Sequence, residues 1–552
     1  MITSHDAPIL GIDLGTTTSL ACVLGDHPRD GQNYPTMIQT DNVLKTEIMP
    51  SLFCLTEDGP LVGNEARELL RNERYRDYVV SNVKRSMGAD AAFTFESITG
   101  RLVTPTYISG IYLKTLREAA EKQLALGSGA ITKAVVTVPA NFGHVERGHT
   151  VKAAEEYGGF SEVHLLDEPI AAAIGLNLHR QRKRQLVLVL DLGGGTLDVT
   201  LLLIGKGVGK HGFREMGRGG CAELGGVNWD EEIARFVVKT CDKTRGPDFR
   251  RDINFFDYTN VDLYEPCEMA KHNLCRDQSL RKVNITYRDK QLGEVVDCGM
   301  TRNEFRVYTI HWAKLCAAIC NWLLMDIHSE DREYIRRYKR GWLQLFSRKT
   351  TPLSWREIDR VFLVGGASKI PAVKEHIAEY WGQEPTVPDR PQHQVAYGAA
   401  TCAASLESGD GLMSDMQLRS PHTTGYYGMA TSDGESEFHP IIRRNKLIPT
   451  TARITCPIDA SNAKGTNPNK PFRVNIVEEQ FEYIPFTNKR RKKRQIVERL
   501  EIRDLPTVRQ AQKDFAEFIV DYPSERELSF KATVRGKVCE VKLNGGSAKR
   551  HT

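Results

Sequence analysis

A pattern of apolar run, aspartate, leucine, glycine and threonine occurs twice in this sequence, at Gly11–Thr17 (GIDLGTT) and at Leu190–Thr196 (LDLGGGT). In each copy an aspartate ends a strand-like run, and a turn rich in glycine and threonine leads into the next one. Glycine lets the backbone approach a ligand closely, so that consecutive N–H groups can point at phosphate oxygens. The repetition therefore predicts two related lobes, each of which contributes one hairpin to a shared cleft.

The paired hairpins predict a phosphate site with a metal ion. Asp13 and Asp191, facing each other from the two lobes, are expected to hold a hydrated Mg²⁺ between the β- and γ-phosphates of a nucleotide. The residues expected to face the phosphates are Gly15, Thr16, Thr17, Gly193, Gly194 and Gly195. One such turn alone would describe an ordinary tight hairpin equally well, but two in one chain favour phosphate binding.

Two further glycine-rich segments have other interpretations. Gly207–Gly212 (GVGKHG) matches GxGxxG, but no apolar helical pattern follows it, so we interpret it as a hairpin loop and not as a dinucleotide site. Val364–Ser368 (VGGAS) ends a strand and opens a predicted helix over Ser368–Tyr380, with Ser368 as its N-cap. Such a helix start suits a ribose or a phosphate, although alone it would describe an ordinary strand-to-helix turn. The sequence contains no GxxxxGK[ST] motif, which excludes a P-loop ATPase.

Periodicity divides the chain into an α/β part and a β-rich part. Strand-like runs alternate with helical patterns as far as residue 404, which predicts α/β layers. Strands are expected at Ile9–Leu14, Ala134–Val138, Leu186–Leu190, Leu197–Ile204 and Val361–Val364, and helices at Tyr107–Lys122, Val145–Tyr157, Trp229–Lys239, Asp262–Leu274 and Thr301–Met325. The last helix opens with Thr301 and Glu304 at capping-box spacing.

The segment 405–420 is polar and rich in glycine and serine, which is typical of a linker. From 421 to 546, short alternating runs separated by turns predict a small domain like a β-sandwich, and 547–552 form a tail. Its strands are expected at Ala452–Pro457, Phe472–Val477, Ile496–Ile502, Glu517–Asp521, Glu527–Thr533 and Lys537–Leu543.

The composition indicates a cytoplasmic protein. Of 552 residues, 40% are hydrophobic and 26% charged, with a net charge of +5, as in ordinary globular proteins. No apolar run is long enough to span a membrane, and the N-terminus lacks the pattern of a signal peptide. The twelve cysteines include no CxxC pair, which favours reduced thiols over disulfides or a zinc site.

The sequence resembles the DnaK-type (seventy-kilodalton heat-shock) chaperone family of the actin-like ATPase superfamily. Besides the two hairpins, the matching segments, in the family's order, are Asn82–Gly88 (NVKRSMG), Ala134–Phe142 (AVVTVPANF) with Arg147, Leu166–Ala173 (LDEPIAAA), Leu224–Asp230 (LGGVNWD), Cys267–Leu274 (CEMAKHNL), Val364–Pro371 (VGGASKIP) and Gln394–Ala400 (QVAYGAA). The resemblance implies that residues 1–404 form an α/β actin-like ATPase domain with two lobes built on duplicated ribonuclease-H-like cores. This domain would bind ATP and ADP and hydrolyse ATP with Mg²⁺.

The resemblance also implies roles for individual residues. Lys84 would neutralise charge at the γ-phosphate and Glu168 would orient the attacking water. Thr196 would contact the γ-phosphate, and Asp198 would support the metal-bound waters. Around the adenosine, Glu268 and Lys271 would flank the adenine and ribose, and the other pocket residues would be Gly226, Cys275, Gly365, Gly366, Ala367 and Lys369.

Each catalytic role has a structural alternative. Lys84 could be one more solvated charge, and Asp198 could be an exposed strand residue. Glu168 could be an acid at a helix N-terminus, where the helix dipole favours it.

The sequence also departs from the family pattern. Cys275 and Lys369 stand where serine and arginine are usual, and a lysine cannot stack on adenine as a guanidinium does, so weaker affinity is expected. Gln392 stands where an aspartate is expected.

For the whole chain, the resemblance implies an ATP-dependent chaperone whose C-terminal β domain binds extended or unfolded peptides. J-domain-type co-chaperones and nucleotide exchange factors would be further partners. No helical lid follows the β region, and 405–420 lacks the family's run of leucines, so weak coupling between the domains is expected. The alternative is a nucleotide-switched regulatory protein with one dedicated partner. A small-molecule kinase of the same superfamily is disfavoured by the segments around Lys84 and Glu168.

Two charged segments remain. Residues 326–352, rich in arginine and tryptophan, form either a docking surface for a partner or a helical insertion packed on the lobe, and the second is favoured because charge-laced helices are usually solvated faces. The basic run Lys489–Arg494 is interpreted as a charged hairpin loop. No aromatic residues interleave with it, so nucleic acid is not an expected ligand.

Overall fold

The computed structural model divides into two compact units, the first comprising Met1–Ala140 and His149–Met413, the second Asn141–Gly148 and Ser414–Thr552. It describes residues 7–26, 33–41, 45–88, 93–140, 142–208, 212–245, 261–276, 279–289, 294–327, 329–340, 351–409 and 412, and in the C-terminal region 426–430, 438–442, 450–458, 472–484, 489–503, 514–524, 527–534 and 537–543. Within these ranges, no helix has both the length and the apolar character that crossing a membrane requires.

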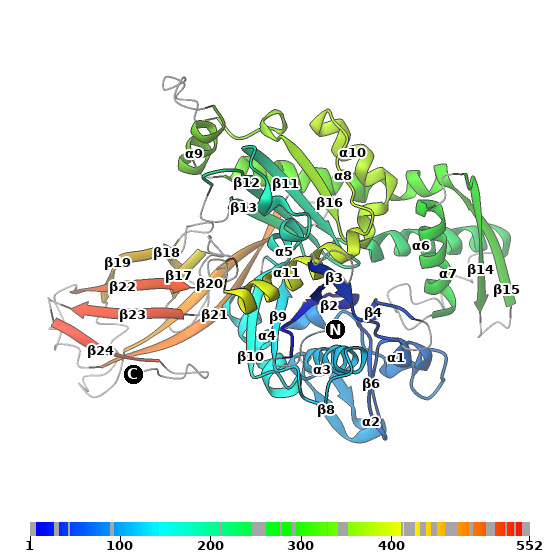
Figure 1. The fold of residues 1–552 in the computed structure, drawn as a ribbon, viewed down its shortest axis with the longest axis horizontal. Coiled ribbons are helices and arrows are strands. Elements are labelled where there is room, and N and C mark those ends of the chain that lie inside the picture. Colours follow the sequence, from blue (N-terminus) through cyan, green and yellow to red (C-terminus); the bar gives the residue numbers. More distant parts are fainter. Residues whose placement is uncertain are drawn as a thin grey trace. The chain divides into compact units, whose positions relative to one another are not determined.

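The first sheet is built on the hairpin that carries the first aspartate–glycine–threonine turn (Figure 1). In spatial order its strands are β10 (Glu162–Asp167), β9 (Lys133–Val138), β1 (Leu10–Leu14), β2 (Thr18–Asp26) and β3 (Asn33–Met37), and β4 (Met49–Pro50) pairs with β2. β1 and β2 are antiparallel, whereas β9 is parallel to β1 and β10 is parallel to β9. The residues of β1 and β9 are buried on both faces, as in parallel sheets covered by helices.

The second sheet repeats this plan. Its strands, in spatial order, are β13 (Phe213–Cys221), β12 (Leu197–Ile204), β11 (Gln185–Leu192) and β16 (Arg360–Val364). β11 and β12 form the antiparallel hairpin, and β16 runs parallel to β11 as β9 does to β1. A parallel bridge between Phe362 and Thr386 lies where the first sheet has β10. The two aspartate–glycine turns therefore occupy equivalent places in two sheets, and the loop between β12 and β13 is a hairpin, as predicted.

Helices and small hairpins complete the first unit. Its helices are α1 (Gly63–Leu69), α2 (Glu96–Thr99), α3 (Pro105–Gln123), α5 (Glu168–Gly175), α6 (Gly226–Arg245), α7 (Val261–Arg276), α8 (Arg302–Asp326), α9 (Ser329–Arg340), α10 (Pro371–Trp381) and α11 (Gln394–Ser408), and α4 (His144–Lys152) belongs to it from His149 on. Its small hairpins pair β5 (Phe53–Thr56) with β6 (Gly59–Val62), β7 (Phe93–Phe95) with β8 (Arg101–Val103), and β14 (Lys282–Asp289) with β15 (Glu294–Thr301). Thr301 and Glu304 form the predicted capping box of α8.

Helix α11 connects the end of the first unit to the first sheet. A Cβ atom at Gly398 would overlap the carbonyl oxygen of Ala171 in α5, and one at Gly11 in β1 would overlap the backbone of Ala400. Ala396 and Ala400 are buried in one cluster with Leu20, Cys22 and Met37. Backbone therefore packs on backbone at Gly11 and Gly398, which only glycine allows because it has no Cβ atom.

The start of α10 differs from the prediction. Ser368 is not its N-cap, because Gly366–Lys369 form a 3₁₀ turn and α10 begins at Pro371, with Ile370 as N-cap. Proline suits this first position, since its fixed φ matches the helix and its missing N–H would have had no partner there. The Ser368 hydroxyl instead donates to the carbonyl oxygen of Gly365, at 2.7 Å.

The structure describes parts of the predicted linker, 405–420, and of the insertion, 326–352. Helix α11 continues to Ser408, which lies inside the range predicted as a linker, and Leu412 is buried. The rest of 410–420 lies outside the described residues.

In the insertion, α9 buries Ile335 in the core of its lobe, and the Arg336 guanidinium pairs with Glu357 at 2.9 Å. The preferred interpretation, a helix packed on the lobe, is confirmed for this part of the insertion.

The C-terminal region consists of strands wherever the structure describes it. In spatial order these are β18 (Phe438–Ile442), β17 (Tyr426–Ala430), β20 (Phe472–Ile484), β21 (Lys489–Arg503), β24 (Lys537–Leu543), β23 (Glu527–Val534), β22 (Asp514–Ser524) and β19 (Thr450–Ile458). Each pairing whose register is given is antiparallel. The predicted strands of this region are all present, and several extend beyond the predicted ends.

The basic run was placed wrongly by the sequence. Lys489–Arg494 is not a hairpin loop but the first part of strand β21, paired with β20. The register places Arg491 opposite Glu482 and Arg494 opposite Glu479. Because the acids lie in a different segment, the run by itself gave no indication of this pairing.

The contact between α11 and α5 generates a stability prediction. We expect Gly398→Ala to lower the free energy of unfolding by about 1–3 kcal/mol, since the methyl group has no space at the Ala171 carbonyl. Alanine is the better helix former, so helix propensity alone predicts the opposite sign. Urea unfolding measures the difference. Gly127→Ala is the control, because a Cβ at Gly127 meets no atom within 4 Å; a Gly398→Ala variant as stable as this control would contradict the prediction.

Candidate functional site

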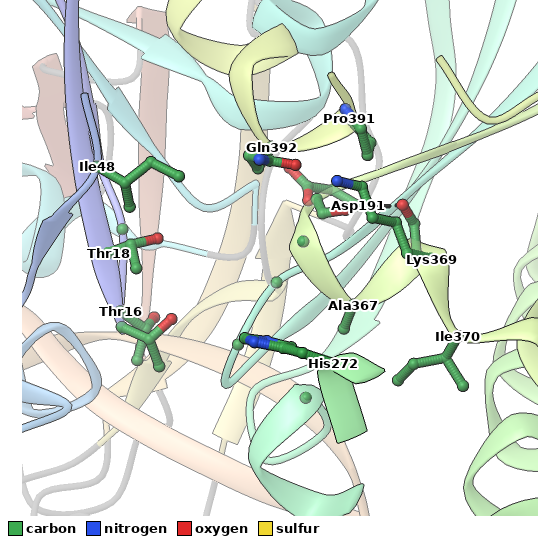
Figure 2. Close-up of a pocket in the computed structure, with 18 of the residues that line it drawn as sticks. Thr16, Thr18, Ile48, Asp191, His272, Ala367, Lys369, Ile370, Pro391 and Gln392 are labelled. Carbon is green, nitrogen blue, oxygen red and sulfur yellow. Dashed lines mark hydrogen bonds between the residues drawn. The ribbon is translucent and has the colours of Figure 1, made fainter. Parts of the chain in front are cut away.

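A cavity of about 920 Å³ lies between the two hairpin turns and is lined from both lobes (Figure 2). Figure 2 shows Thr16, Thr18 and Ile48 on one side of this space and Lys369 and Ile370 on the other. The sequence-predicted residues that line it are Asp13, Gly15, Thr16, Thr17, Glu168, Asp191, Gly193, Gly194, Thr196, Gly226, Glu268, Lys271, Cys275, Gly365, Gly366, Ala367 and Lys369. Three predicted residues, Lys84, Gly195 and Asp198, are not part of the lining.

The two hairpin turns lie against each other. A Cβ atom at Gly194 would overlap the side chain of Thr17 in the other turn. The carbonyl oxygen of Gly195 accepts a hydrogen bond from the Arg85 guanidinium, which comes from the first lobe. Within the second turn, the Gly193 N–H donates to the Thr196 carbonyl oxygen at 3.0 Å. Glycine is therefore required at position 194 by the close approach of Thr17 from the first lobe.

Lys84 and Glu168 form a buried ion pair beside the cavity. Lys84 lies in the 3₁₀ turn Val83–Ser86, and its ammonium donates to Glu168 Oε1 and to the carbonyl oxygen of Leu14. The Lys84 side chain is only 5% exposed. The solvated-charge alternative for Lys84 is therefore wrong, and the exposed-strand alternative for Asp198 is wrong as well, since this residue is 2% exposed.

The aspartates at and beside the cavity are buried close to the negative charge of Glu168. Burial, and then the negative charge of Glu168, raise the pKa of Asp13 to about 7 and that of Asp198 to about 8. The same causes, with Asp13 and Asp198 added, hold the pKa of Asp191 well above its usual range. Lys84 opposes all three shifts. A site with this charge distribution favours a bound cation.

The opposite end of the cavity is formed by the turn after β16 and by α6 and α7. Gly365 has a φ of +82°, and a Cβ atom there would overlap the Asp191 carboxylate. Lys271 in α7 donates to Asp230 Oδ2 at 2.6 Å and to the carbonyl oxygen of Gly226 at 3.2 Å. Lys271 thus holds the first turn of α6 in place, while burial raises the pKa of Asp230 to about 7 against the opposing charge of Lys271.

Sequence reasoning missed several residues of the lining, among them Arg67, His272 and Arg276. His272 and Arg276 lie on α7 at helical spacing from Glu268, so the predicted helix contained an indication of them. Burial, and next the charge of Lys271, lower the pKa of His272. Arg67 had no such indication, because it belongs to α1, far away in the sequence.

Arg67 links α1 to α7 across the cavity. Its guanidinium lies 3.2 Å from Glu265 Oε1 and 3.2 Å from Glu268 Oε2. The neighbouring Arg71 lies 2.5 Å from Glu265 Oε2. These side chains are partly exposed, and exposed ion pairs typically contribute about 0.2–1 kcal/mol each. These ion pairs therefore contribute little to the stability of the contact between α1 and α7.

Comparisons with known proteins relate the chain to one family. The family model described as Hsp70 protein matches residues 9–338 and 333–467. The chain is 31% identical over 445 residues to the chaperone protein DnaK of Mycoplasma mobile, covering 80% of this chain and 65% of that protein. It is also 31% identical over 448 residues to the chaperone protein DnaK of Thermotoga neapolitana, covering 80% and 66%. The chain thus spans slightly less than two thirds of the length of these relatives.

The raised pKa of Asp198 generates a prediction for the protein without nucleotide or metal. The folded chain keeps this proton to about pH 8, whereas the unfolded chain loses it near the ordinary value of 3.8. The stability that the protonated Asp198 contributes is therefore complete below pH 3.8 and lost as the pH rises through 8. We expect Asp198→Asn to raise the melting temperature, relative to the parent, more at pH 8 than at pH 5.

Thermal unfolding in a chelating buffer, at pH 5 and at pH 8, measures the difference in melting temperature between Asp198→Asn and the parent. Asp58→Asn, on an exposed turn, is the control and should give the same small difference at both pH values. An Asp198→Asn difference that does not grow with pH would contradict the prediction.

Proposed function

Because the chain belongs to the Hsp70 protein family, we propose that residues 1–404 are an actin-like ATPase domain that binds ATP in the cavity between the hairpins and hydrolyses it. The observation that carries the proposal is the meeting of two aspartate–glycine–threonine turns, from two sheets of the same plan, at one cavity. The repeated plan supports duplicated ribonuclease-H-like cores. Gly15, Thr16, Thr17, Gly193, Gly194, Gly195 and Thr196 would contact the phosphates.

The aspartates fit a magnesium ion bound through water. Among the residues that the structure describes, no three metal-ligating side chains converge closely enough to hold an ion. Mg²⁺ suits such a site, because it usually keeps several waters and takes one or two carboxylates together with substrate phosphates. Asp13 and Asp191 would hold these waters, with Asp198 as a further acceptor. The ion would neutralise phosphate charge, and its own charge would offset the repulsion among the aspartates.

The ion pair beside the cavity supports the catalytic roles. Glu168 lines the cavity and would orient the attacking water, while Lys84 would offset the charge that develops on the transferring phosphoryl group. Their mutual contact fixes both side chains before any ligand arrives. A buried pair of this kind is costly to desolvate, which supports a functional reason for its presence.

The adenosine would bind at the end of the cavity formed by α7 and the turn after β16. Glu268, Lys271 and Cys275 would contact it from α7, and Gly226, Gly365, Gly366, Ala367 and Lys369 from the facing backbone and side chains. His272 and Lys369 face this end from opposite elements (Figure 2). The neutral form of His272, favoured by its lowered pKa, presents a flat ring that suits stacking on a base.

For the whole chain, we propose a cytoplasmic ATP-dependent chaperone. The relatives named above are chaperone proteins, and the strands from β17 to β24 suit an extended peptide, which β-rich domains bind through backbone hydrogen bonds and side-chain pockets. ATP would control peptide binding, with J-domain-type co-chaperones and nucleotide exchange factors as partners. The alternative is a nucleotide-switched regulatory protein that serves one dedicated partner.

We expect Lys84→Ala to bind ATP but to hydrolyse it 10²–10³-fold more slowly, the typical effect of removing one electrostatic stabiliser of a transition state, about 2.7–4 kcal/mol. Binding draws on the hairpins and the adenosine end, which the substitution leaves unchanged. Single-turnover phosphate release measures the rate, and a fluorescent nucleotide measures the affinity. Lys114→Ala, whose side chain is 48% exposed on α3, is the control. A Lys84→Ala variant with the parental rate would show that Lys84 has another role.

The chaperone proposal predicts that an unfolded peptide raises the rate of ATP hydrolysis and that ATP weakens peptide binding. Linkage requires that the peptide weaken ATP binding by the same factor as ATP weakens peptide binding. Since 405–420 lacks a run of leucines, we expect a factor of about five, the lower end of the usual range. Phosphate release and the anisotropy of a labelled peptide measure the two effects on one preparation. Hydrolysis without any peptide binding would favour the dedicated-partner alternative.

A further inference from the structure

A buried cluster of one arginine and two carboxylates, Asp167, Glu215 and Arg218, joins the two sheets without lining the cavity. Arg218 Nη2 lies 2.9 Å from Asp167 Oδ2, and Arg218 Nε lies 2.6 Å from Glu215 Oε1. Arg218 Nη1 donates to the carbonyl oxygen of Ala140 at 2.6 Å. Asp167 ends β10 and Ala140 follows β9, both in the first sheet, whereas Glu215 and Arg218 belong to β13 in the second. One guanidinium therefore connects two strand ends of one lobe to a strand of the other.

A β-bulge brings Glu215 and Arg218 together. Residues three apart in a regular strand point to opposite faces of the sheet. In the pairing of β12 with β13, Leu201 lies opposite Gly217 but Leu202 lies opposite Glu215, which leaves Met216 as an extra residue. Such an insertion changes the phase of the strand and redirects its side chains. The bulge explains how the Glu215 carboxylate can accept two hydrogen bonds from Arg218, at 2.6 and 2.9 Å.

Asp167 contacts Arg218 instead of performing the usual task of its position. It is the N-cap residue of α5, where an aspartate ordinarily accepts a hydrogen bond from a backbone N–H of the first turn. No such capping hydrogen bond is present at Asp167. The next residue is Glu168, whose carboxylate lines the cavity. The place of Glu168 is thus set on one side by Lys84 and on the other by the attachment of Asp167 to β13.

The cluster also lies close to Asp198. This aspartate belongs to β12 and is paired in register with Gly220 of β13, two residues from Arg218. The positive charge of Arg218 lowers the pKa of Asp198, while the negative charge of Asp167 raises it. The cluster is therefore joined to Glu168 by the peptide bond between Asp167 and Glu168, and it acts on Asp198 through the charges of Arg218 and Asp167. These two groups belong to the two sides of the proposed catalytic centre.

We propose that Arg218 is a positioning residue for ATP hydrolysis, an inference that rests on the function proposed above. By holding Asp167 and Ala140 against β13, it fixes Glu168 of the first lobe relative to Asp198 of the second. The planar fork of arginine suits this task, since two nitrogens engage Glu215 while the third is directed at the backbone. The two lobes are thereby kept in one arrangement at the site where a water molecule must be oriented.

The test uses a triple variant of the full chain, Asp167→Asn, Glu215→Gln and Arg218→Gln. Replacing all three charges leaves no carboxylate buried without its partner, which a single Arg218 substitution would do. We expect the melting temperature and the ATP affinity to be retained and the single-turnover rate to fall by about 10–100-fold, because a misplacement of 1 Å can cost about 10²-fold. Arg218→Lys, which keeps the charge without the fork, should have an intermediate rate.

The control is the double variant Arg336→Gln and Glu357→Gln, which removes an ion pair between α9 and the turn after it, away from the site. It should keep the parental rate. A folded triple variant that also keeps the parental rate would overturn the proposal. So would a triple variant whose rate falls only in proportion to its loss of ATP affinity or folded fraction, because that result describes a merely structural role.

A second measurement separates this inference from the proposed function. Amide hydrogen exchange over residues 166–173 reports how firmly β10 and α5 are held, whether or not ATP is hydrolysed. We expect faster exchange there in the triple variant and no change in the control. A parent that releases no phosphate would overturn the ATPase proposal, whereas unchanged exchange in the triple variant would overturn the role of Arg218.

Discussion

Repulsion among buried carboxylates is the constraint on which the rest of the α/β part depends. The two sheets direct Asp13, Asp191 and Asp198 to one place, and burial together with Glu168 raises the pKa of each. A core under this repulsion needs compensating positive charge. Lys84 supplies it next to the cavity. Arg218 supplies more near Asp198, so the buried carboxylates explain why these two cations are buried as well.

The contacts that hold the α/β part together differ in strength. Helices α5 and α11 meet through backbone at Gly398, a contact that offers no freedom to separate without repacking. The cluster around Arg218 is buried and equally inflexible. The pairs that Arg67 makes with α7 are partly exposed and weak. The α/β part therefore combines tightly packed buried contacts with weak ion pairs at the cavity.

Much of the site could be predicted because its chemistry is local in sequence. The turns at Gly15 and Gly193 each contain their own glycines, threonines and strand-ending aspartate, and they were placed at the cavity as expected. Errors arose where a partner segment decided the outcome. Ser368 matched an N-cap, but Pro371 was the better helix start. The basic run at the start of β21 was predicted to be a loop, because the residues paired with it, such as Glu482, lie in another strand.

The sequence by itself determined the repeated aspartate–glycine turns and the strands and helices that carry them. It also determined that strands predominate near the C-terminus. Both follow from hydrophobic periodicity and turn residues, which depend only on neighbouring positions in the chain. Only the tertiary structure decided which charges meet. Arg67 and Glu265 are brought together by the approach of α1 to α7. Arg218 meets Glu215 because a bulge changes the phase of β13, and it meets Asp167 because β10 and β13 of the two sheets approach each other. Such pairings depend on how distant segments pack, which no local pattern encodes.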